Sequence, residues 1–237
     1  MVDHFIALLD HLHLGKVIVV GHDWGTAPAN RFVLYHPERT LGLVLISGGY
    51  RPPAEFNLDQ ALEVAKKVLG YENIGYFKFF ESDDAATIIE NNADSFIDLV
   101  YASDPTLWKT DFAPVGKFRE WLTKGRKTIR ASFMTEDDYK NLRQHLLEGM
   151  QPKLNWYKAA IENINRKDEK NLDSTIKCPV LFFGGMKDAI CLPMLYANQK
   201  QYIADLETVE IDASHWIMEE KPDEINRSIE QWIKRIV

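Results

Sequence analysis

The sequence has few cysteines and no long apolar run, and each shortage excludes a class of protein. Two cysteines, Cys178 and Cys191, are too few for a disulfide framework and lack the clustering with histidine of a zinc site. We expect both to be buried, reduced thiols. No apolar segment approaches the roughly 20 residues that a membrane span requires. The N-terminus also lacks the layout of a signal peptide, so we expect a cytoplasmic protein without a membrane span.

The sequence also has no excess of basic residues. Its net charge is −7, and acidic and basic residues are interspersed, which leaves no basic face for nucleic acid. Hydrophobic residues make up 46% of the 237 positions and aromatic residues 11%, enough to build a core and too many for a disordered chain. The length suits one domain, or one domain with an insertion.

The order of the apolar runs predicts a sheet flanked by helices. An amphipathic helix that contains Phe5, Leu8 and Leu12 should open the chain, and Gly15 should end it in a left-handed conformation. Strands are expected at 17–20, 41–46, 179–185 and 207–211, and helices at 29–36 and 222–236. The β-branched run 17–20 suits a strand buried on both faces. Alternation of strands and helices is typical of an α/β fold with a parallel sheet.

Between residues 50 and 172 the strand-like runs disappear and helical periodicity with many aromatic residues replaces them. We expect an all-helical insertion that begins near Pro52-Pro53 and ends in the polar stretch 163–170. The predicted domains are therefore an α/β core of residues 1–49 and 173–237, and a helical cap or lid of residues 50–172.

The segment Gly21-His22-Asp23-Trp24-Gly25 lies between a predicted strand and a predicted helix. Small residues on both sides of Asp23 permit a sharp turn that lifts its side chain clear of the backbone, as at the nucleophile of many hydrolases. The turn also places the Trp24 N–H at a helix N-terminus, where it can stabilise an oxyanion. The alternative is an aspartate that only caps the helix.

Two further polar residues, Asp188 and His215, follow the last two predicted strands. Sites in open parallel sheets form beyond the carboxyl ends of the strands, so Asp23, Asp188 and His215 should share one edge. Taken alone, Asp188 could start a helix and His215 could be a surface residue. The chain order of nucleophile, acid and histidine favours a catalytic group. Glu219 and Glu220 are most simply solvated charges.

Three motifs of the chain resemble those of the epoxide hydrolases of the α/β-hydrolase superfamily. They are Val-Gly-His-Asp-Trp-Gly at 20–25, Gly-Gly-x-x-Asp at 184–188 and Ser-His-Trp at 214–216. The resemblance covers nearly the whole chain and implies an α/β-hydrolase fold, a mostly parallel sheet with a helical cap inserted.

The resemblance also implies two tyrosines on the cap. Tyr76 stands in a Tyr-x-x-x-Phe segment and Tyr157 in Asn-Trp-Tyr. By residue type alone, each would be a packing residue with a wet hydroxyl. Trp24 and Trp156 are expected to bind substrate.

The implied reaction is hydrolysis of an apolar epoxide to a vicinal diol through a covalent aspartyl ester. Asp23 would attack the less hindered carbon, and Tyr76 and Tyr157 would protonate the alkoxide. His215, oriented by Asp188, would activate the water that hydrolyses the ester. No metal, organic cofactor or nucleic acid is implied.

The chain departs from the family at its N-terminus, because the strands that carry a His-Gly-x-Pro turn have no counterpart. We expect that Met1 is an internal start, that a second oxyanion donor is missing and activity impaired, and that the strand at 17–20 is an edge prone to self-association. Two alternatives remain: a haloalkane-type dehalogenase with the same Asp-His-Asp machinery, which the tyrosines disfavour, and a non-catalytic remnant.

Overall fold

The protein consists of two compact units in a computed structural model that describes residues 1–237. The core unit comprises Met1–Ala54 and Lys167–Val237, and the helical unit comprises Glu55–Arg166. The division predicted from the sequence, at residues 50 and 172, differs from this one by a few residues at each boundary. The role of the helical unit as a lid stays a prediction. None of the helices combines the length and the apolarity that a bilayer crossing requires.

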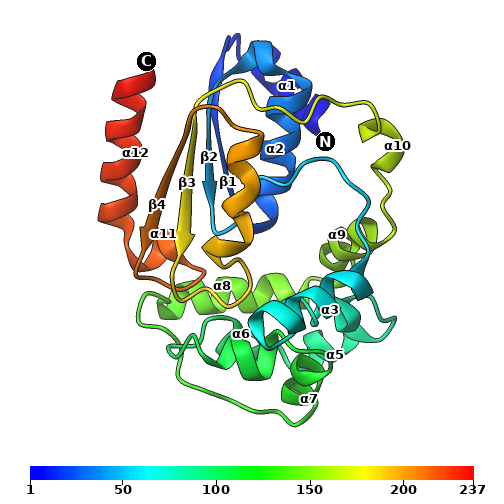
Figure 1. Ribbon diagram of the computed structural model, residues 1–237. Coiled ribbons are helices and arrows are strands. Elements are labelled where there is room, and N and C mark those ends of the chain that lie inside the picture. The colour runs from blue at the N-terminus through cyan, green and yellow to red at the C-terminus, as the bar shows by residue number, and fades with distance from the viewer. The chain divides into compact units, whose positions relative to one another are not determined.

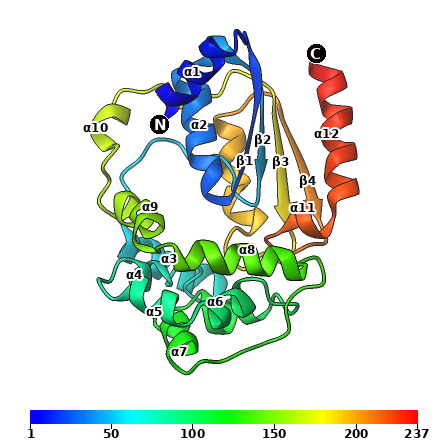
Figure 2. The same cartoon turned by 180° about the vertical axis from the view of Figure 1, so that it is seen from behind.

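The core unit is built on four parallel strands in the order β1-β2-β3-β4 (Figure 1). Its elements are α1 (Val2–His11), β1 (Val17–His22), α2 (Thr26–Tyr35), β2 (Thr40–Ile46), β3 (Val180–Gly185), β4 (Leu206–Ile211), α11 (Ile217–Glu220) and α12 (Pro222–Ile236), with 3₁₀ turns at Asp23–Gly25, Pro37–Arg39 and Pro193–Gln201. Helices α1 and α2 lie on one face of the sheet and α12 lies on the other (Figures 1 and 2). The predicted α/β architecture is confirmed.

The two central strands carry the hydrophobic core of this unit. Every residue of β3 is buried, and α12 packs its apolar stripe against the sheet through Ile225 and Trp232. Gly42 of β2 makes this approach feasible, because a Cβ at that position would lie 2.5 Å from the Trp232 ring. Burial of each large apolar side chain contributes about 1.5–3 kcal/mol to folding, so α12 is held chiefly by this stripe.

The first helix and strand differ from the prediction in two respects. Helix α1 ends at His11, and the left-handed residue after it is His13 with φ 55°, whereas Gly15 has no positive φ. The expected burial of β1 on both faces is wrong, since Val20 is 55% exposed. Strand β1 pairs with β2 on one side only, and no residue of α1 is buried. The β1 end of the sheet and helix α1 therefore have much of their surface exposed.

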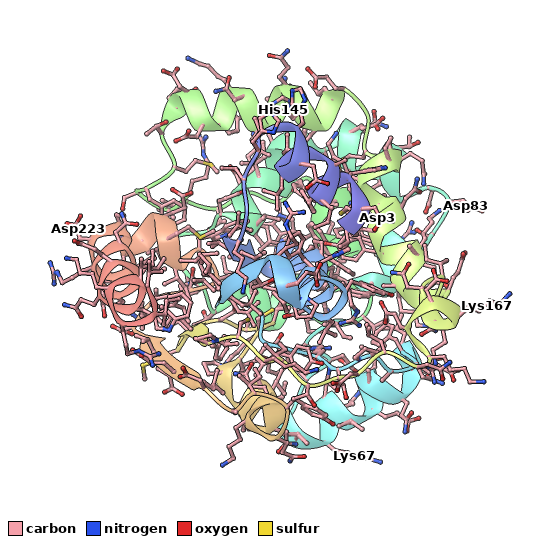
Figure 3. The ribbon with its side chains drawn as sticks, turned by 90° about the horizontal axis from the view of Figure 1, so that it is seen from above. Asp3, Lys67, Asp83, His145, Lys167 and Asp223 are labelled. Atoms are coloured by element: carbon pink, nitrogen blue, oxygen red, sulfur yellow. The ribbon has the colours of Figure 1, made fainter.

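The helical unit contains no strand. Its elements are α3 (Leu58–Leu69), α4 (Phe77–Phe80), α5 (Ala85–Asn91), α6 (Ala93–Val100), a π-helical turn (Trp108–Phe112), α7 (Lys117–Thr123), α8 (Glu136–Leu147) and α9 (Gln151–Ile161), and α10 (Arg166–Glu169) leads back to the core unit. Helix α8 starts in a capping box, in which Thr135 and Asp138 each accept the other's backbone N–H. Polar side chains such as Lys67, Asp83 and His145 point into solvent, as the even spread of polar residues in the sequence predicts (Figure 3).

Candidate active site

Asp23 stands at a strained turn between β1 and α2. Its φ is 49°, in the left-handed region that non-glycine residues rarely adopt and that often marks functional sites. The Thr26 hydroxyl donates to the Asp23 carbonyl oxygen over 2.6 Å and holds the turn. A Cβ on Gly21 would lie 2.5 Å from the Gly25 carbonyl oxygen, whereas one on Gly25 would touch nothing within 4 Å. The expectation that both flanking residues must be small therefore holds at Gly21 only.

This difference predicts unequal effects of two matched substitutions. Gly21→Ala forces a methyl group into the backbone of the turn and should lower the free energy of unfolding by about 1–3 kcal/mol, as overpacking does. Gly25→Ala, four residues away, should change it by less than about 0.5 kcal/mol. Urea denaturation of both variants measures the difference. Equal losses of stability would contradict the steric account of the turn.

The Asp188 carboxylate is buried and holds the imidazole of His215. Its Oδ2 accepts a hydrogen bond from His215 Nδ1 over 2.8 Å, and its Oδ1 accepts the N–H groups of Ile190 and Cys191 over 2.8 and 2.9 Å. The Asp188 side chain has no exposed surface. Three donors on one buried carboxylate fix the plane of the ring and direct its Nε2 away from Asp188.

The loops that carry Asp188 and His215 meet because β3 and β4 are neighbours in register. Gly185 pairs with Ile211 at the end of the ladder, and the Lys187 N–H continues it by donating to the Ala213 carbonyl oxygen over 2.9 Å. A Cβ on Gly185 would lie 2.3 Å from the Ser214 carbonyl oxygen, so only glycine permits this approach. The register of the sheet thus sets the acid beside the histidine.

His215 also faces Asp23. Its Nε2 lies 3.4 Å from Asp23 Oδ1, which brings together the three residues that the sequence placed on one sheet edge. Burial by itself lowers the pKa of His215, but the bonded Asp188 carboxylate, the Cys191 side chain and the nearby Asp23 carboxylate together outweigh burial and raise it well above its usual range. The imidazolium is therefore favoured in the free site.

Two residues that the sequence analysis did not select hold the backbone of His215. Ser47 Oγ and His22 Nε2 both donate to the His215 carbonyl oxygen, over 2.7 and 3.1 Å. Because a carbonyl oxygen only accepts, His22 Nε2 carries the hydrogen, and burial together with the His215 charge lowers the pKa of His22. His22 ends β1 and Ser47 follows β2, at the sheet edge that bears Asp23. This placement was the signal that could have found them.

Glu220 is a third such residue and corrects the prediction of a solvated charge. Its carboxylate accepts the Ser214 N–H over 3.1 Å and also the Ser214 hydroxyl. It therefore fixes the residue immediately before His215. Its neighbour Glu219 is exposed, as expected.

The two predicted tyrosines come together within the helical unit. The ring of Tyr76, just before α4, lies 5.9 Å from that of Tyr157 on α9, and both pack edge-on against Phe80 at 5.3 and 4.6 Å. Gly75 allows this position, since a Cβ there would lie 2.4 Å from the Val115 backbone nitrogen. Residues 81 positions apart in the chain thus share one aromatic cluster, and their hydroxyl chemistry stays a prediction.

The two predicted tryptophans lie in different units. Trp24 is in the 3₁₀ turn that follows β1, directly after Asp23, and Trp156 precedes Tyr157 on α9 with 41% of its surface exposed. Their roles in substrate binding, and that of the Trp24 N–H as an oxyanion donor, stay predictions. The cysteines are free thiols, and Cys191 is buried as expected whereas Cys178 is only half-buried.

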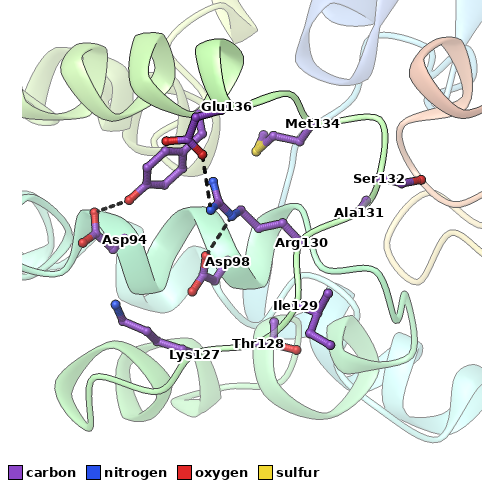
Figure 4. A pocket seen from close by; sticks show the side chains of 11 residues that line it. Asp94, Asp98, Lys127, Thr128, Ile129, Arg130, Ala131, Ser132, Met134 and Glu136 are labelled. Atoms are coloured by element: carbon purple, nitrogen blue, oxygen red, sulfur yellow. Dashed lines mark hydrogen bonds and ion pairs between the residues drawn. The ribbon is translucent and has the colours of Figure 1, made fainter.

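An open cavity of about 600 Å³ lies at the surface of the helical unit, and none of the predicted site residues lines it (Figure 4). Its charged groups are largely satisfied by one another. Arg130 lies 3.5 Å from the Asp98 carboxylate and stacks on the Tyr139 ring at 3.9 Å, and the Tyr139 hydroxyl donates to Asp94 over 2.8 Å. This cavity does not carry the chemistry that the core unit assembles.

Comparison with known proteins relates this chain to hydrolases. The sequence profile described as alpha/beta hydrolase fold matches residues 1–222. The chain is 24% identical to "Bifunctional epoxide hydrolase 2" of Mus musculus over 97% of its own length and 41% of the relative's. It is 26% identical to "Epoxide hydrolase 3" of Siraitia grosvenorii over 99% of its own length and 75% of the relative's. The chain thus spans about two fifths of the mouse relative.

Solved structures give the same picture. An epoxide hydrolase from an endophytic Streptomyces superposes with a TM-score of 0.80 at 25% identity, over 98% of this chain and 72% of that one. Potato (Solanum tuberosum) epoxide hydrolase I superposes with a TM-score of 0.74 at 21% identity, over 99% of this chain and 75% of that one. At 21% identity, the similarity to the potato enzyme shows a shared fold alone.

Proposed function

Because the chain belongs to the alpha/beta hydrolase fold family, we propose that it hydrolyses epoxides to vicinal diols with Asp23 as the nucleophile. The observation that carries the proposal is Asp23 at a left-handed turn, with His215 Nε2 3.4 Å from its carboxylate and Asp188 bonded to the far side of the imidazole. The names of the mouse and Siraitia relatives agree with the reaction.

In the first step an Asp23 carboxylate oxygen attacks one epoxide carbon, and the carbon–oxygen bond of the ring breaks. The product is an ester of Asp23, and the ring oxygen leaves as an alkoxide that needs a proton. Tyr76 and Tyr157 are the proposed proton donors, because their adjacent rings are held by one aromatic cluster. A carboxylate suits this reaction since water can hydrolyse its ester, whereas a serine would end as an inert ether.

In the second step His215 takes a proton from water, which attacks the carbonyl carbon of the ester. Formation of the ester removes the negative charge of Asp23, one of the two carboxylates that raise the pKa of His215. The first step therefore lowers the proton affinity of the imidazole, so that the imidazolium releases its proton to solvent and becomes the base of the second step. The Asp188 carboxylate stabilises the imidazolium that forms.

The Trp24 N–H is the proposed donor to the oxyanion of the second step, since it follows the nucleophile at the start of the turn into α2.

Replacing Tyr157 by phenylalanine distinguishes the proposal from a dehalogenase. Epoxide opening needs a proton, so kcat/KM for styrene oxide should fall by about 10²-fold or more, the usual worth of a general acid. A halide leaves without a proton, so an alkyl halide would be dehalogenated at an unchanged rate if the alternative were correct. Diol and halide release are measured for both proteins, with Tyr139→Phe as a matched control. Absence of diol formation by the wild type contradicts the proposal.

The unpaired edge of β1 is a proposed contact between copies of this chain. Apolar edge strands without charge pair readily with another strand. Exposed apolar surface is added by Val20, Phe5, Leu8 and Leu12. Analytical ultracentrifugation should show concentration-dependent association that Val20→Lys weakens. A chain that stays monomeric at high concentration would contradict this contact.

A further inference from the structure

A third potential ligand lies beside the proposed nucleophile and base. An Asp23 carboxylate oxygen, the Cys191 sulfur and a ring nitrogen of His215 all lie within 4.8 Å of one another. We propose that these three side chains bind a thiophilic divalent cation, for which Zn²⁺ and Cd²⁺ are the probes, and that the bound ion switches the site off.

The distances approach those of a tetrahedral site. Zinc bonds of about 2.0–2.2 Å to nitrogen and oxygen imply a ligand–ligand edge of roughly 3.4 Å. The observed separation of His215 Nε2 and Asp23 Oδ1 is 3.4 Å. A zinc–sulfur bond of about 2.3 Å lengthens the edge to sulfur to roughly 3.6 Å. Since the sulfur lies within 4.8 Å of the other two ligand atoms, closure needs a sulfur movement of at most about 1 Å. Water would supply the fourth ligand.

The surroundings of the three ligands support a metal more than a chance cluster. The carboxylate of Asp188 accepts from His215 Nδ1 and from the Cys191 N–H, over 2.8 and 2.9 Å, and so positions two of the three ligands. A carboxylate behind a histidine is the usual outer support of a metal-ligating imidazole. The Asp23 side chain is 32% exposed, which gives an ion a route from solvent.

The ligand types select the ion. One thiolate and one imidazole favour Zn²⁺, Cd²⁺ or copper, and disfavour Mg²⁺ and Ca²⁺, which prefer oxygen ligands. On binding, the Cys191 thiol and the His215 imidazolium each release a proton to solvent, and the freed sulfur and nitrogen bond the ion. The inhibitory part of the inference rests on the proposed function, because the ion occupies both the oxygen that attacks and the nitrogen that accepts a proton.

Cadmium titration of the purified chain tests the site without an activity measurement. Thiolate bonding to Cd²⁺ produces an ultraviolet charge-transfer band, and X-ray absorption counts the sulfur atoms around the ion. We expect a saturable band and one sulfur per cadmium in the wild type. Cys191→Ser should lose the band, whereas Cys178→Ser, which removes the other thiol of the chain, should keep it. Circular dichroism confirms that both variants are folded.

A parallel activity assay separates metal binding from its inhibitory effect. Diol formation from styrene oxide should fall in proportion to the band in the wild type and in Cys178→Ser, and a chelator should restore it. A band without any turnover would support the metal site and contradict the proposed function. Turnover without a band, a band that survives Cys191→Ser, or coordination without sulfur would overturn the metal site.

Discussion

Replacing Asp23 by alanine should lower kcat/KM for styrene oxide by about 10⁴-fold or more, the scale of loss when a nucleophile is removed. The variant lacks the carboxylate whose Oδ1 lies 3.4 Å from His215 Nε2, so no ester can form. Steady-state diol formation at several substrate concentrations measures the loss.

Two comparisons make this result specific to the nucleophile. Asp3→Ala removes an exposed carboxylate from the same unit and should leave the rate unchanged. Alanine tolerates the left-handed φ of 49° at this position less well than aspartate, so circular dichroism must confirm that Asp23→Ala is folded before its rate is compared. A variant that retains a tenth of the wild-type rate would exclude Asp23 as the nucleophile.

Replacing His215 by glutamine should separate the two steps of the reaction. The ester should form within about tenfold of the wild-type rate, whereas its hydrolysis should slow by about 10²–10⁴-fold, the usual contribution of a general base. The covalent species should therefore accumulate, because Asp23 needs no base to attack. Rapid-quench mass spectrometry of the intact chain measures the adduct over time.

The expected pattern is a burst of one adduct per chain followed by very slow diol release. Loss of adduct formation together with diol release would mean that His215 serves the first step or the fold instead. Ser47→Ala is a useful companion, since it removes one donor to the His215 carbonyl oxygen and leaves the imidazole in place. Its smaller effect should fall on ester hydrolysis.

The sequence predicted the positions of the strands more accurately than the burial of their residues. Apolar runs at 41–46 and 179–185 became β2 and β3, because both strands are central and buried on both sides. The parallel order then fixed where Asp23, Asp188 and His215 would meet, since carboxyl ends of parallel strands share an edge. Val20 is exposed although the apolar run 17–20 predicted its burial, because burial depends on a neighbouring element that a periodic pattern does not reveal.

The supporting contacts of the site could not be predicted for a related reason. Ser47 and His215 are separated by 168 positions, and their hydrogen bond depends on how two loops leave the sheet. Glu220 is polar and partly exposed, so its type and position gave no sign that it holds Ser214. Cys191 was expected only to be buried, and the ligand cluster emerged from the turn after Asp188.

The aromatic pair shows what a motif adds to residue type. Tyr76 and Tyr157 are ordinary packing residues by composition, and the family motifs alone suggested a shared task. The structure places their rings 5.9 Å apart in one cluster, a necessary condition for joint proton donation. The proton transfer itself is tested by the Tyr157→Phe comparison.

A single turnover in water enriched in the heavy oxygen isotope tests the covalent mechanism most directly. With the chain in excess over styrene oxide, water attacks the ester carbonyl carbon, so the heavy oxygen should enter the Asp23 carboxylate and the diol should leave with an oxygen that Asp23 supplied. Mass spectrometry of the peptide that contains Asp23, and of the diol, reads both positions. A labelled diol with an unlabelled Asp23 would show direct attack by water on the epoxide and would contradict the role of Asp23 as the nucleophile.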